Sequence, residues 1–495
     1  MTEPALAFTF PRRPTPRRGL VAVLALLVLL IAAGRIRFAL TEPLWFDETF
    51  TLAITGQETW AGFLRECWHD PGGPAYYLLA RLWTGLFGAG DLAVRAPSLI
   101  AVAIAGALPM LIKVPGLSQP ARIGWGLMTY AWWGVGFFLD ARCYALLLAI
   151  STGQLIAFAR LMQTPGLRRG LIWAGLAALA IVTHYYALFF GLAQGLIYLA
   201  RWRLSAVRTW PAALAFAPAF AEIAWHAPQL KRFSALGKVW HPDLTAAGVV
   251  QVATFLVNPI GPLALAGAAL VLILARLAGR RDDTELEVPP AAIWLTAGSG
   301  VLAFALVLAF ALTGSGLSPR YLIPAAPALM LGLVLIAQAG PRPSLALGGL
   351  VFLWLGLQVS PALDGLGPRR PLPRYEFETA SEFLMAKGVT DVAFLWDHEV
   401  TPIIPTDTIA RVGGVFFQRA GRPVRVTPLV VTPDQDPNRL IPQAASGAKP
   451  GFIWLYNQDG HTAAHRFPPT LDKAPGWSCQ RTAPGPAGVL ACAKG

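Results

Sequence analysis

The chain has 495 residues, of which 55% are hydrophobic and only 14% are charged, and its mean hydropathy is +0.52. A soluble chain carries about 25% charged residues, so the composition excludes an ordinary soluble enzyme and indicates a polytopic membrane protein. The formal net charge of +13 does not indicate nucleic-acid binding. Much of the excess lies in short loops between apolar segments, and no soluble segment carries a basic stripe with stacking aromatics.

A basic, proline-rich tail, residues 1–19, leads into the first apolar run. A basic stub before an apolar run resembles a signal peptide. This run continues to Arg35 and Arg37 without a small-residue cleavage site, so we expect it to stay as a first membrane span. The tail is then cytoplasmic.

Apolar stretches of roughly 17–23 residues predict about eleven membrane spans. They lie near residues 20–38, 93–112, 122–139, 144–161, 170–186, 187–200, 210–226, 260–277, 291–313, 322–339 and 344–360. Basic loops after every second span fall on the side of the tail, as the positive-inside rule requires. A smaller basic set falls outside, where it either serves an anionic ligand or marks a local error in this topology: Arg35, Arg65, Arg81, Lys231, Arg232 and Lys238.

The first outer loop, residues 41–92, contains a second apolar segment at 75–89. This segment is short for a span and has Arg81 in its middle, and counting it as a span would invert every later loop. Its Tyr, Trp and Arg residues favour an amphipathic helix that lies in the membrane interface.

The composition changes after residue 360. Residues 361–373 are rich in Pro, Gly and Arg and predict a linker, and residues 374–495 predict a small α/β domain. Within this domain, residues 379–387 are expected to form a helix that ends at Gly388, and residues 392–396 and 452–456 buried strands. An odd number of spans places the domain outside the cytoplasm.

The four cysteines fit this arrangement. Cys479 and Cys492 lie about a dozen residues apart in the C-terminal domain, a loop that a disulfide can close. The oxidising compartment outside the cytoplasm permits the bond. Cys67 and Cys143 also lie toward the outer face and could pair, but we expect two separate thiols.

Polar residues from loops and span ends far apart in the sequence fall at the outer membrane face in this topology. A structural protein has little reason to gather charges there, whereas a site for a charged, lipid-tethered substrate requires them. The set is Asp47, Glu48, His69, Asp70, Arg95, Asp140, Arg142, His184, Glu222, His226, Arg320 and Tyr321.

Asp47 and Glu48 follow the first span and are flanked by aromatic residues. Side chains of neighbouring residues point to opposite faces of a strand, or about 100° apart on a helix, so the pair is not expected to share one proton. We expect one carboxylate to act while the other orients a positive partner. The alternative is that one of them caps a short helix that starts near Thr49.

The run from His69 to Pro74, His-Asp-Pro-Gly-Gly-Pro, predicts a turn before the interfacial helix. Its glycines allow a close approach of the backbone to another element, or it is simply a tight turn that Asp70 caps.

Two arginine and tyrosine pairs open spans at the outer face. They are Arg142 with Tyr144, and Arg320 with Tyr321. Guanidinium binds phosphate bidentately and stays charged, so both pairs suit a phosphate ligand, although such pairs also anchor helices to lipid headgroups.

Two further polar residues lie inside predicted spans. His184 is either part of the site or a satisfied buried histidine. Glu222 needs a partner within the membrane, and Arg95 and Arg142 are the candidates.

These motifs together resemble the C-type (GT-C) glycosyltransferases, and most of all the protein O-mannosyltransferases and the bacterial aminoarabinose-type transferases. The resemblance covers roughly residues 20–360. It rests on the acidic pair, the His-Asp-Pro-Gly-Gly-Pro run before Tyr-Tyr-Leu-Leu, the segment Ala-Val-Arg-Ala-Pro-Ser at 93–98, and Pro-Arg-Tyr-Leu-Ile-Pro at 319–324. Where the family often has His-Pro-Pro-Leu, this chain has the longer run with Asp70, which puts the type of acceptor in question.

The resemblance implies transfer of a sugar from a polyprenyl phosphate to a lipid, glycan or protein acceptor at the outer membrane face. The family's acidic pair matches Asp47 and Glu48, and its arginine at the outer end of the second span matches Arg95. The expected base is Asp47, with Glu48 in support. The expected phosphate ligands are Arg95, Arg142, Arg320, Tyr144 and Tyr321, and the acceptor or sugar is expected at His69, Asp70, His184 and Glu222.

Three alternatives remain open at this stage. A divalent metal could bridge Asp47 or Glu48 and the phosphate. A transporter or flippase of a lipid-linked or anionic substrate would also hold charges in the membrane, but near the midplane and in repeated halves, and no repeat is visible here. A membrane-anchored binding protein, with the C-terminal domain as its active part, would leave the outer-face charges without a purpose.

Overall fold

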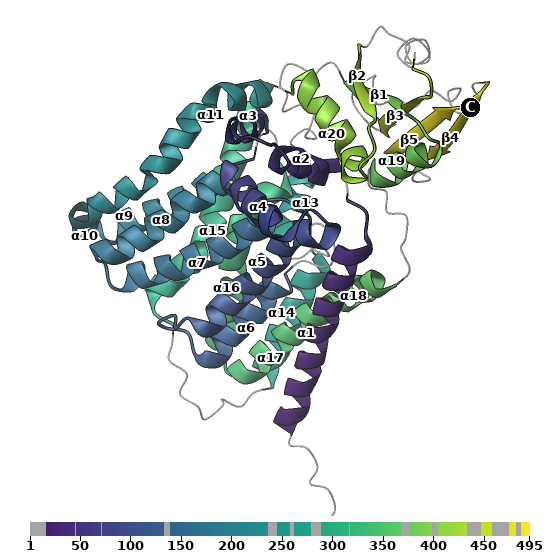
Figure 1. Cartoon of the computed structure of the whole chain (residues 1–495). Coiled ribbons are helices and arrows are strands. Elements are labelled where there is room, and N and C mark those ends of the chain that lie inside the picture. Colours follow the sequence, from purple (N-terminus) through teal and green to yellow (C-terminus); the bar gives the residue numbers. More distant parts are fainter. Residues whose placement is uncertain are drawn as a thin grey trace, which may run out of the picture.

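The computed structural model describes residues 16–44, 46–70, 72–132, 139–235, 245–257, 262–278, 289–315, 317–367, 377–397, 404–432, 447–457, 475–481 and 487–495. These residues form a helical bundle with a small α/β domain at one end (Figure 1). The expected fold class, an α-helical polytopic membrane protein with a small C-terminal α/β domain, is confirmed.

Six helical stretches in the described residues are long and apolar enough to cross a membrane. They are Gly19–Thr41 in α1 (Pro16–Thr41), α5 (Asp91–Leu111), α7 (Tyr144–Gln163), Ala291–Thr313 around α15 (Ala291–Phe310) and η2 (Ala311–Ser315), Pro319–Gln338 in η3 (Pro319–Ala325) and α16 (Ala326–Gln338), and Pro343–Leu366 in α17 (Pro343–Leu357) and α18 (Val359–Leu366). Helix α7 is the centre of the bundle, since 83% of its apolar window is buried, against 17% for α1 at the rim.

Shorter helices complete the bundle. They are α6 (Gln119–Tyr130), α8 (Leu167–Thr183), α9 (Ala187–Arg201), α10 (Arg203–Thr209), the 3₁₀ helix η1 (Trp210–Phe216), α11 (Ala217–Ala235), α13 (Ala246–Val257) and α14 (Pro262–Leu277). Small residues allow close packing, as membrane helices commonly require. A Cβ on Gly126 of α6 would lie 2.4 Å from the carbonyl oxygen of Gly106 on α5.

The segment between α1 and α5 folds into three helices at the end of the bundle that faces the α/β domain. They are α2 (Phe46–Thr55), α3 (Trp60–His69) and α4 (Pro74–Phe87) (Figure 1). The helix predicted at 75–89 is therefore present as α4. Helix α2 begins at Phe46, which places Asp47 and Glu48 inside its first turn rather than ahead of a helix that starts near Thr49.

The C-terminal domain is a five-stranded sheet in the order β2-β1-β3-β5-β4, with helices α19 (Phe377–Ala386) and α20 (Thr406–Arg419). Strand β1 (Asp391–Asp397) is parallel to both β2 (Arg425–Val431) and β3 (Pro450–Asn457). Strand β5 (Ala487–Lys494) runs antiparallel between β3 and β4 (Trp477–Arg481). The helix at 379–387 and the strands at 392–396 and 452–456 are confirmed by α19, β1 and β3.

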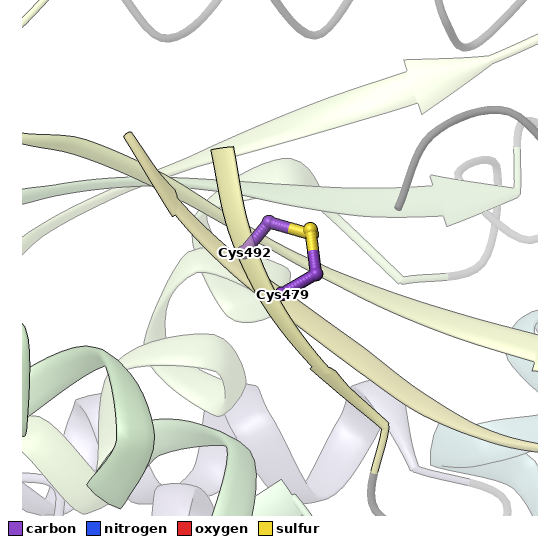
Figure 2. Close-up of a disulfide and its surroundings, with 2 residues drawn as sticks. All are labelled: Cys479 and Cys492. Carbon is purple, nitrogen blue, oxygen red and sulfur yellow. A yellow bond between two sulfur atoms is a disulfide. The ribbon is translucent and has the colours of Figure 1, made fainter. Parts of the chain in front are cut away.

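A disulfide joins Cys479 and Cys492, which are paired neighbours on β4 and β5 (Figure 2). Cys67 and Cys143 are buried free thiols, as expected. The disulfide therefore fixes the two strands at one edge of the sheet.

Several boundaries differ from the prediction. Helix α18 extends to Leu366, so the first six residues of the predicted linker are helical and pack against α1, while residues 368–376 lie outside the described part of the chain. The span predicted at 122–139 ends as a helix at Tyr130, and residues 133–138 are also outside it. The span predicted at 210–226 is a 3₁₀ turn followed by α11. The count of about eleven spans stays a prediction.

Candidate functional site

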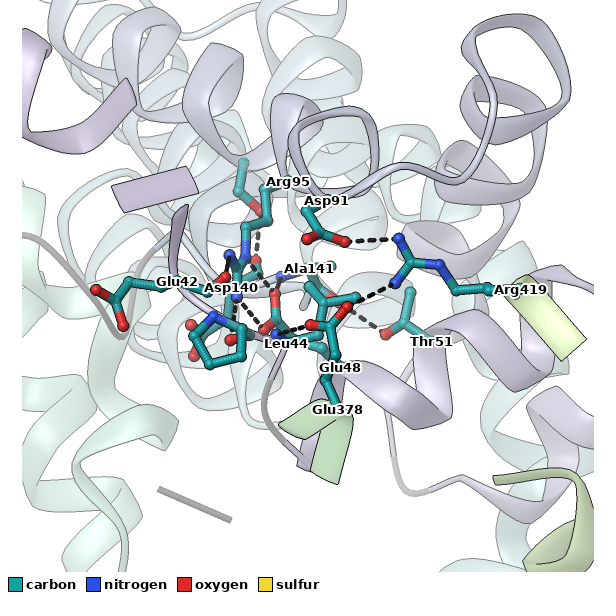
Figure 3. Close-up of polar contacts among 12 residues, drawn as sticks. Glu42, Leu44, Glu48, Thr51, Asp91, Arg95, Asp140, Ala141, Glu378 and Arg419 are labelled. Atoms are coloured by element: carbon teal, nitrogen blue, oxygen red, sulfur yellow. Dashed lines mark hydrogen bonds and ion pairs between the residues drawn. The ribbon is translucent and has the colours of Figure 1, made fainter. Parts of the chain in front are cut away.

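Glu48 forms a dry ion pair with Arg95, and neither side chain has any solvent exposure. The Nε and Nη2 groups of Arg95 donate to the two carboxylate oxygens of Glu48 at 2.8 and 2.6 Å. The backbone amide of Ala141 donates to the same carboxylate at 2.8 Å. Glu48 thus joins α2, α5 and the chain ahead of α7 (Figure 3).

Four of the five N–H donors of Arg95 are bonded within the protein. Its Nη1 donates to the carbonyl of Glu42 at 2.7 Å and its Nη2 also to that of Pro43 at 3.0 Å, so the guanidinium is enclosed by the segment between α1 and α2. This geometry does not support a phosphate contact at Arg95, because the side chain is wholly buried and hydrogen-bonded within the protein. Arg95 therefore has a structural role: it binds the Glu48 carboxylate and the backbone carbonyls of the segment that leads into α2.

Asp47, next to Glu48 in sequence, has the opposite environment. Its side chain is 27% exposed, and its carboxylate accepts one hydrogen bond of 3.3 Å from Nη1 of Arg320, whose side chain is 36% exposed. The same Nη1 donates to the hydroxyl of Tyr144 at 3.2 Å. A single long contact between partly exposed groups is weak and exchangeable, unlike the bidentate pair of Glu48.

A second guanidinium reaches Asp47 from the start of α7. Nη1 of Arg142 lies 3.5 Å from the carbonyl oxygen of Asp47 and donates to the hydroxyl of Tyr77 at 2.7 Å. Arg142 also pairs with Asp70 at 3.5 Å. Asp47 therefore has one arginine at its carboxylate and another at its backbone carbonyl, and two neighbouring guanidinium groups are chemically suited to bind an anion.

Asp70 supports Arg142. Its Oδ1 accepts from the Tyr77 hydroxyl and from the Gly72 amide, both at 2.7 Å. Burial raises the pKa of the Tyr77 hydroxyl well above its ordinary value, so Tyr77 keeps its proton and donates it to Asp70 at neutral pH. Asp70 is only 6% exposed, so its role as a contact for acceptor or sugar has less support than its role in placing Arg142.

The turn between α3 and α4 approaches another helix closely, as its glycines predict. A Cβ on Gly73 would lie 2.1 Å from the carbonyl oxygen of Val182 near the end of α8. This contact fixes the turn that carries Asp70. Pro71 of the same run lies outside the described residues.

Aromatic rings line the neighbourhood of Arg320. Tyr321 stacks on Tyr186 with 3.8 Å between ring centroids, and His184 lies 5.7 Å from Tyr321 and 6.1 Å from Tyr144. The sequence placed His184, Tyr144 and Tyr321 at one level, and the structure brings them together next to Asp47. Tyr186 is a member of this group that the sequence reading did not single out, although it follows His184 by two residues.

Glu222 belongs to a separate cluster on α11. Its carboxylate accepts a hydrogen bond from the Tyr185 hydroxyl, which also lies 2.5 Å from Nδ1 of His226. The other nitrogen of His226 is 2.8 Å from the carbonyl oxygen of Trp68. The expectation that Arg95 or Arg142 pairs with Glu222 is wrong, because those arginines bind Glu48, Asp70 and Tyr77 instead.

His69 lies at the end of α3 beside this cluster, with its ring 5.2 Å from that of Trp68. Burial lowers the pKa of His69, although the nearby carboxylates of Glu66 and Asp407 raise it in part. The imidazole is therefore neutral at neutral pH and can accept or donate one hydrogen bond.

The acidic pair does not suit a bridging metal. Both oxygens of Glu48 are occupied by hydrogen bonds from Arg95 and Ala141, and Asp47 faces two guanidiniums, which repel a divalent cation. Among the described residues, no group of three or more His, Cys, Asp or Glu side chains is arranged to hold a metal ion.

Comparison with known proteins gives a match in fold. No protein-family model and no curated protein matches the sequence. The crystal structure of ArnT from Cupriavidus metallidurans bound to undecaprenyl phosphate matches with a TM-score of 0.54 at 14% identity, over 96% of this chain and 98% of that one. Its apo structure matches with a TM-score of 0.53 at 15% identity, over 97% and 98%. Arabinosyltransferase EmbB from Mycobacterium smegmatis gives 0.39 at 17% identity, over 68% and 32%.

The chain therefore shares the fold of ArnT, as the motifs led us to expect. The match to ArnT extends over nearly the whole length of both chains, the C-terminal domain included.

Proposed function

We propose that this protein is a membrane glycosyltransferase that moves a sugar from a polyprenyl phosphate to an acceptor at the outer face of the inner membrane. The fold supports the donor class, since ArnT, an aminoarabinose transferase with this fold, has been solved with undecaprenyl phosphate bound. The observation that carries the proposal is the contrast within the acidic pair: Glu48 is buried against Arg95, whereas Asp47 is partly exposed beside Arg320 and Arg142.

In the proposed reaction, Asp47 takes the proton of an acceptor hydroxyl while the hydroxyl oxygen attacks the anomeric carbon. The bond from that carbon to the phosphate oxygen breaks, and its electron pair leaves with the polyprenyl phosphate. Because the leaving group is already an anion, no general acid is required. A positioned base contributes about 10²–10⁴-fold to such a rate, and a single displacement inverts the anomeric centre.

Arg320 and Arg142 are proposed to stabilise the departing phosphate. Cationic donors aimed at developing negative charge stabilise a transition state more than the ground state. The long contact from Arg320 to Asp47 can be exchanged for the phosphate, which would free the carboxylate for the acceptor at the moment the donor binds. Tyr144 and Tyr321 border the same anion site.

The acceptor or sugar is proposed to contact the polar aromatic groups beyond Asp47. His184 adjoins Tyr144 and Tyr321, and Glu222 on α11 accepts a hydrogen bond from Tyr185, the residue after His184. Aromatic rings next to a carboxylate and an imidazole suit the apolar face and the hydroxyls of a sugar. His69, neutral at the end of α3, is the third candidate.

The topology that we propose places the C-terminal domain in the periplasm and the N-terminus in the cytoplasm. Basic loops on the tail side support this orientation. The Cys479–Cys492 disulfide in the C-terminal domain supports it as well, because such bonds persist in oxidising compartments.

The test is transfer by the purified protein from a panel of undecaprenyl-phosphate pentoses and hexoses, followed as release of undecaprenyl phosphate. Asp47→Asn is expected to lower the rate by about 10²–10⁴-fold. Glu58→Gln is the matched control, because Glu58 is an exposed carboxylate in the same loop, and it should leave the rate unchanged. Full activity of Asp47→Asn would remove Asp47 as the base.

A further inference from the structure

The C-terminal domain holds the segment that carries Asp47 through a partly buried hydrogen bond. Oε2 of Glu378, on α19, accepts from the backbone amide of Leu44 at 3.1 Å. Leu44 has no solvent exposure and precedes Asp47 by three residues. This contact therefore fixes the backbone where the chain leaves α1 and turns into α2.

A second contact ties the same domain to the helix of Arg95. Nη2 of Arg419, at the end of α20, donates to Asp91 at 2.6 Å, and its Nη1 lies 3.8 Å from Oε1 of Glu378. Asp91 is the first residue of α5 and lies one turn before Arg95. Leu44, Glu378, Arg419 and Asp91 thus form a continuous polar chain, which we call the domain clamp (Figure 3).

Apolar packing joins the clamp to α2 itself. A helix shorter than about 12–15 residues is only marginally stable alone, so the ten residues of α2 depend on what they pack against. Helix α20 packs on α2, and one buried cluster contains residues of both parts of the chain. Its members include Leu44, Leu52, Ala53 and Val94 from the bundle, and Phe377, Val412, Val415 and Phe416 from the domain.

The C-terminal domain also contacts α3, the helix that follows α2, through hydrogen bonds. Glu66 on α3 is 2% exposed and accepts hydrogen bonds from Thr408, at 2.8 Å, and from Arg411 of α20. The domain therefore contacts the chain before α2, α2 itself and the helix after it. Asp47 stands on a short helix whose position is set from both ends by residues more than 300 positions away.

We propose that Glu378 and Arg419 are positioning residues for the transfer reaction: through Leu44 and Asp91 they set the place of the Asp47 carboxylate relative to Arg320 and the acceptor. The inference rests on the proposed function of Asp47. A reacting group misplaced by about 1 Å costs about 10²-fold in rate, so loss of the clamp should lower turnover without removing any group that touches the substrate.

The experiment compares four variants of the full-length protein. Glu378→Ala removes the acceptor for Leu44 and the partner of Arg419, whereas Glu378→Gln keeps one acceptor oxygen and replaces the other with an uncharged NH₂ group. Arg419→Met keeps the length of the side chain without its donors. Arg425→Met is the matched control, since Arg425 makes an exposed ion pair with Asp391 in the same domain, away from α2.

Two measurements are made on each variant. The first is kcat and KM for release of undecaprenyl phosphate from its sugar-linked form. The second is hydrogen exchange of the amides in residues 44–55. Glu378→Ala and Arg419→Met are expected to lower kcat at least tenfold with KM within about twofold, and to speed exchange in 44–55. Glu378→Gln should retain more activity than Glu378→Ala, and Arg425→Met should match the unmodified protein.

Two results would overturn the inference. The first is unchanged kcat and unchanged exchange in Glu378→Ala and Arg419→Met. The second is an equal loss in Arg425→Met, which would mean that the domain matters only through its overall stability. The proposed function fails separately, if Asp47→Asn keeps full transfer. In that case faster exchange in 44–55 would still show that the clamp orders α2, while the catalytic part of the inference would be lost.

Discussion

Glu48 and Asp47 are adjacent in sequence, yet removing the charge of each should change the stability of the protein to very different extents. Glu48→Gln leaves the side-chain shape nearly unchanged but turns one acceptor oxygen into an NH₂ group that faces the donors of Arg95. The guanidinium then stays buried without a compensating charge. Asp47→Asn removes a carboxylate that is 27% exposed and has one long contact.

The magnitudes follow from these environments. Breaking a fully buried ion pair by removing one partner costs about 3–5 kcal/mol, and Glu48 also loses part of its bond from the Ala141 amide. A partly exposed pair contributes about 0–1 kcal/mol. We therefore expect Glu48→Gln to destabilise the protein by several kcal/mol and Asp47→Asn to leave its stability nearly unchanged.

The assay is unfolding of the detergent-purified variants, followed by tryptophan fluorescence in denaturant and on heating. A double variant, Glu48→Met with Arg95→Met, serves as the control, because replacing both members of a buried pair by apolar groups is often neutral or stabilising. It should recover most of the stability lost in Glu48→Gln. Equal stability of Glu48→Gln and Asp47→Asn would refute the assignment of a structural role to Glu48.

Three further predictions follow from the site. Arg320→Met should weaken binding of undecaprenyl phosphate at least tenfold in a thermal-shift titration, because a hydrogen bond to a charged group is worth about 1.5–3 kcal/mol; unchanged affinity would exclude Arg320 from the phosphate site. Gly73→Ala should lower the melting temperature, since its Cβ would meet the carbonyl of Val182, whereas Gly85→Ala, in open space on α4, should not. EDTA should not change the transfer rate of the purified protein, because Glu48 is occupied by Arg95; inhibition that added divalent cation restores would contradict this.

Much of the fold could be predicted because apolar run length is a direct signal for membrane helices. The long runs at 20–38, 93–112 and 144–161 became α1, α5 and α7. Strands β1 and β3 were visible as short apolar runs after the change in composition. By contrast, β2, β4 and β5 carry Pro428, exposed polar residues and small residues. Their places in the sheet depend on pairing: β2 with β1, β5 with β3, and β4 with β5.

The sequence predicted which residues form the candidate site, but not which of them form ion pairs with one another. Topology alone placed Asp47, Arg142 and Arg320 at one level, and the structure brings them together. The pairing of each carboxylate with an arginine depends on which side chains are buried together. The sequence therefore could not show that Glu48 forms an ion pair with Arg95. Tyr77 was missed as the link between Asp70 and Arg142, because an aromatic residue in an interfacial helix has an ordinary explanation.

The contacts of the C-terminal domain had no signal in the sequence at all. Glu378, Arg411 and Arg419 are ordinary charged residues of amphipathic helices, and their partners Leu44, Glu66 and Asp91 lie more than 300 positions away. They meet where α19 and α20 of the domain pack against the segment from Leu44 to α3 and the start of α5.

A structure of the protein with undecaprenyl phosphate tests the central claim most directly. The proposal predicts that the phosphate lies within hydrogen-bonding distance of the guanidiniums of Arg320 and Arg142, beside the Asp47 carboxylate, and that the Glu48–Arg95 pair is unchanged. A phosphate bound elsewhere in the bundle, or one that draws Arg95 away from Glu48, would contradict it.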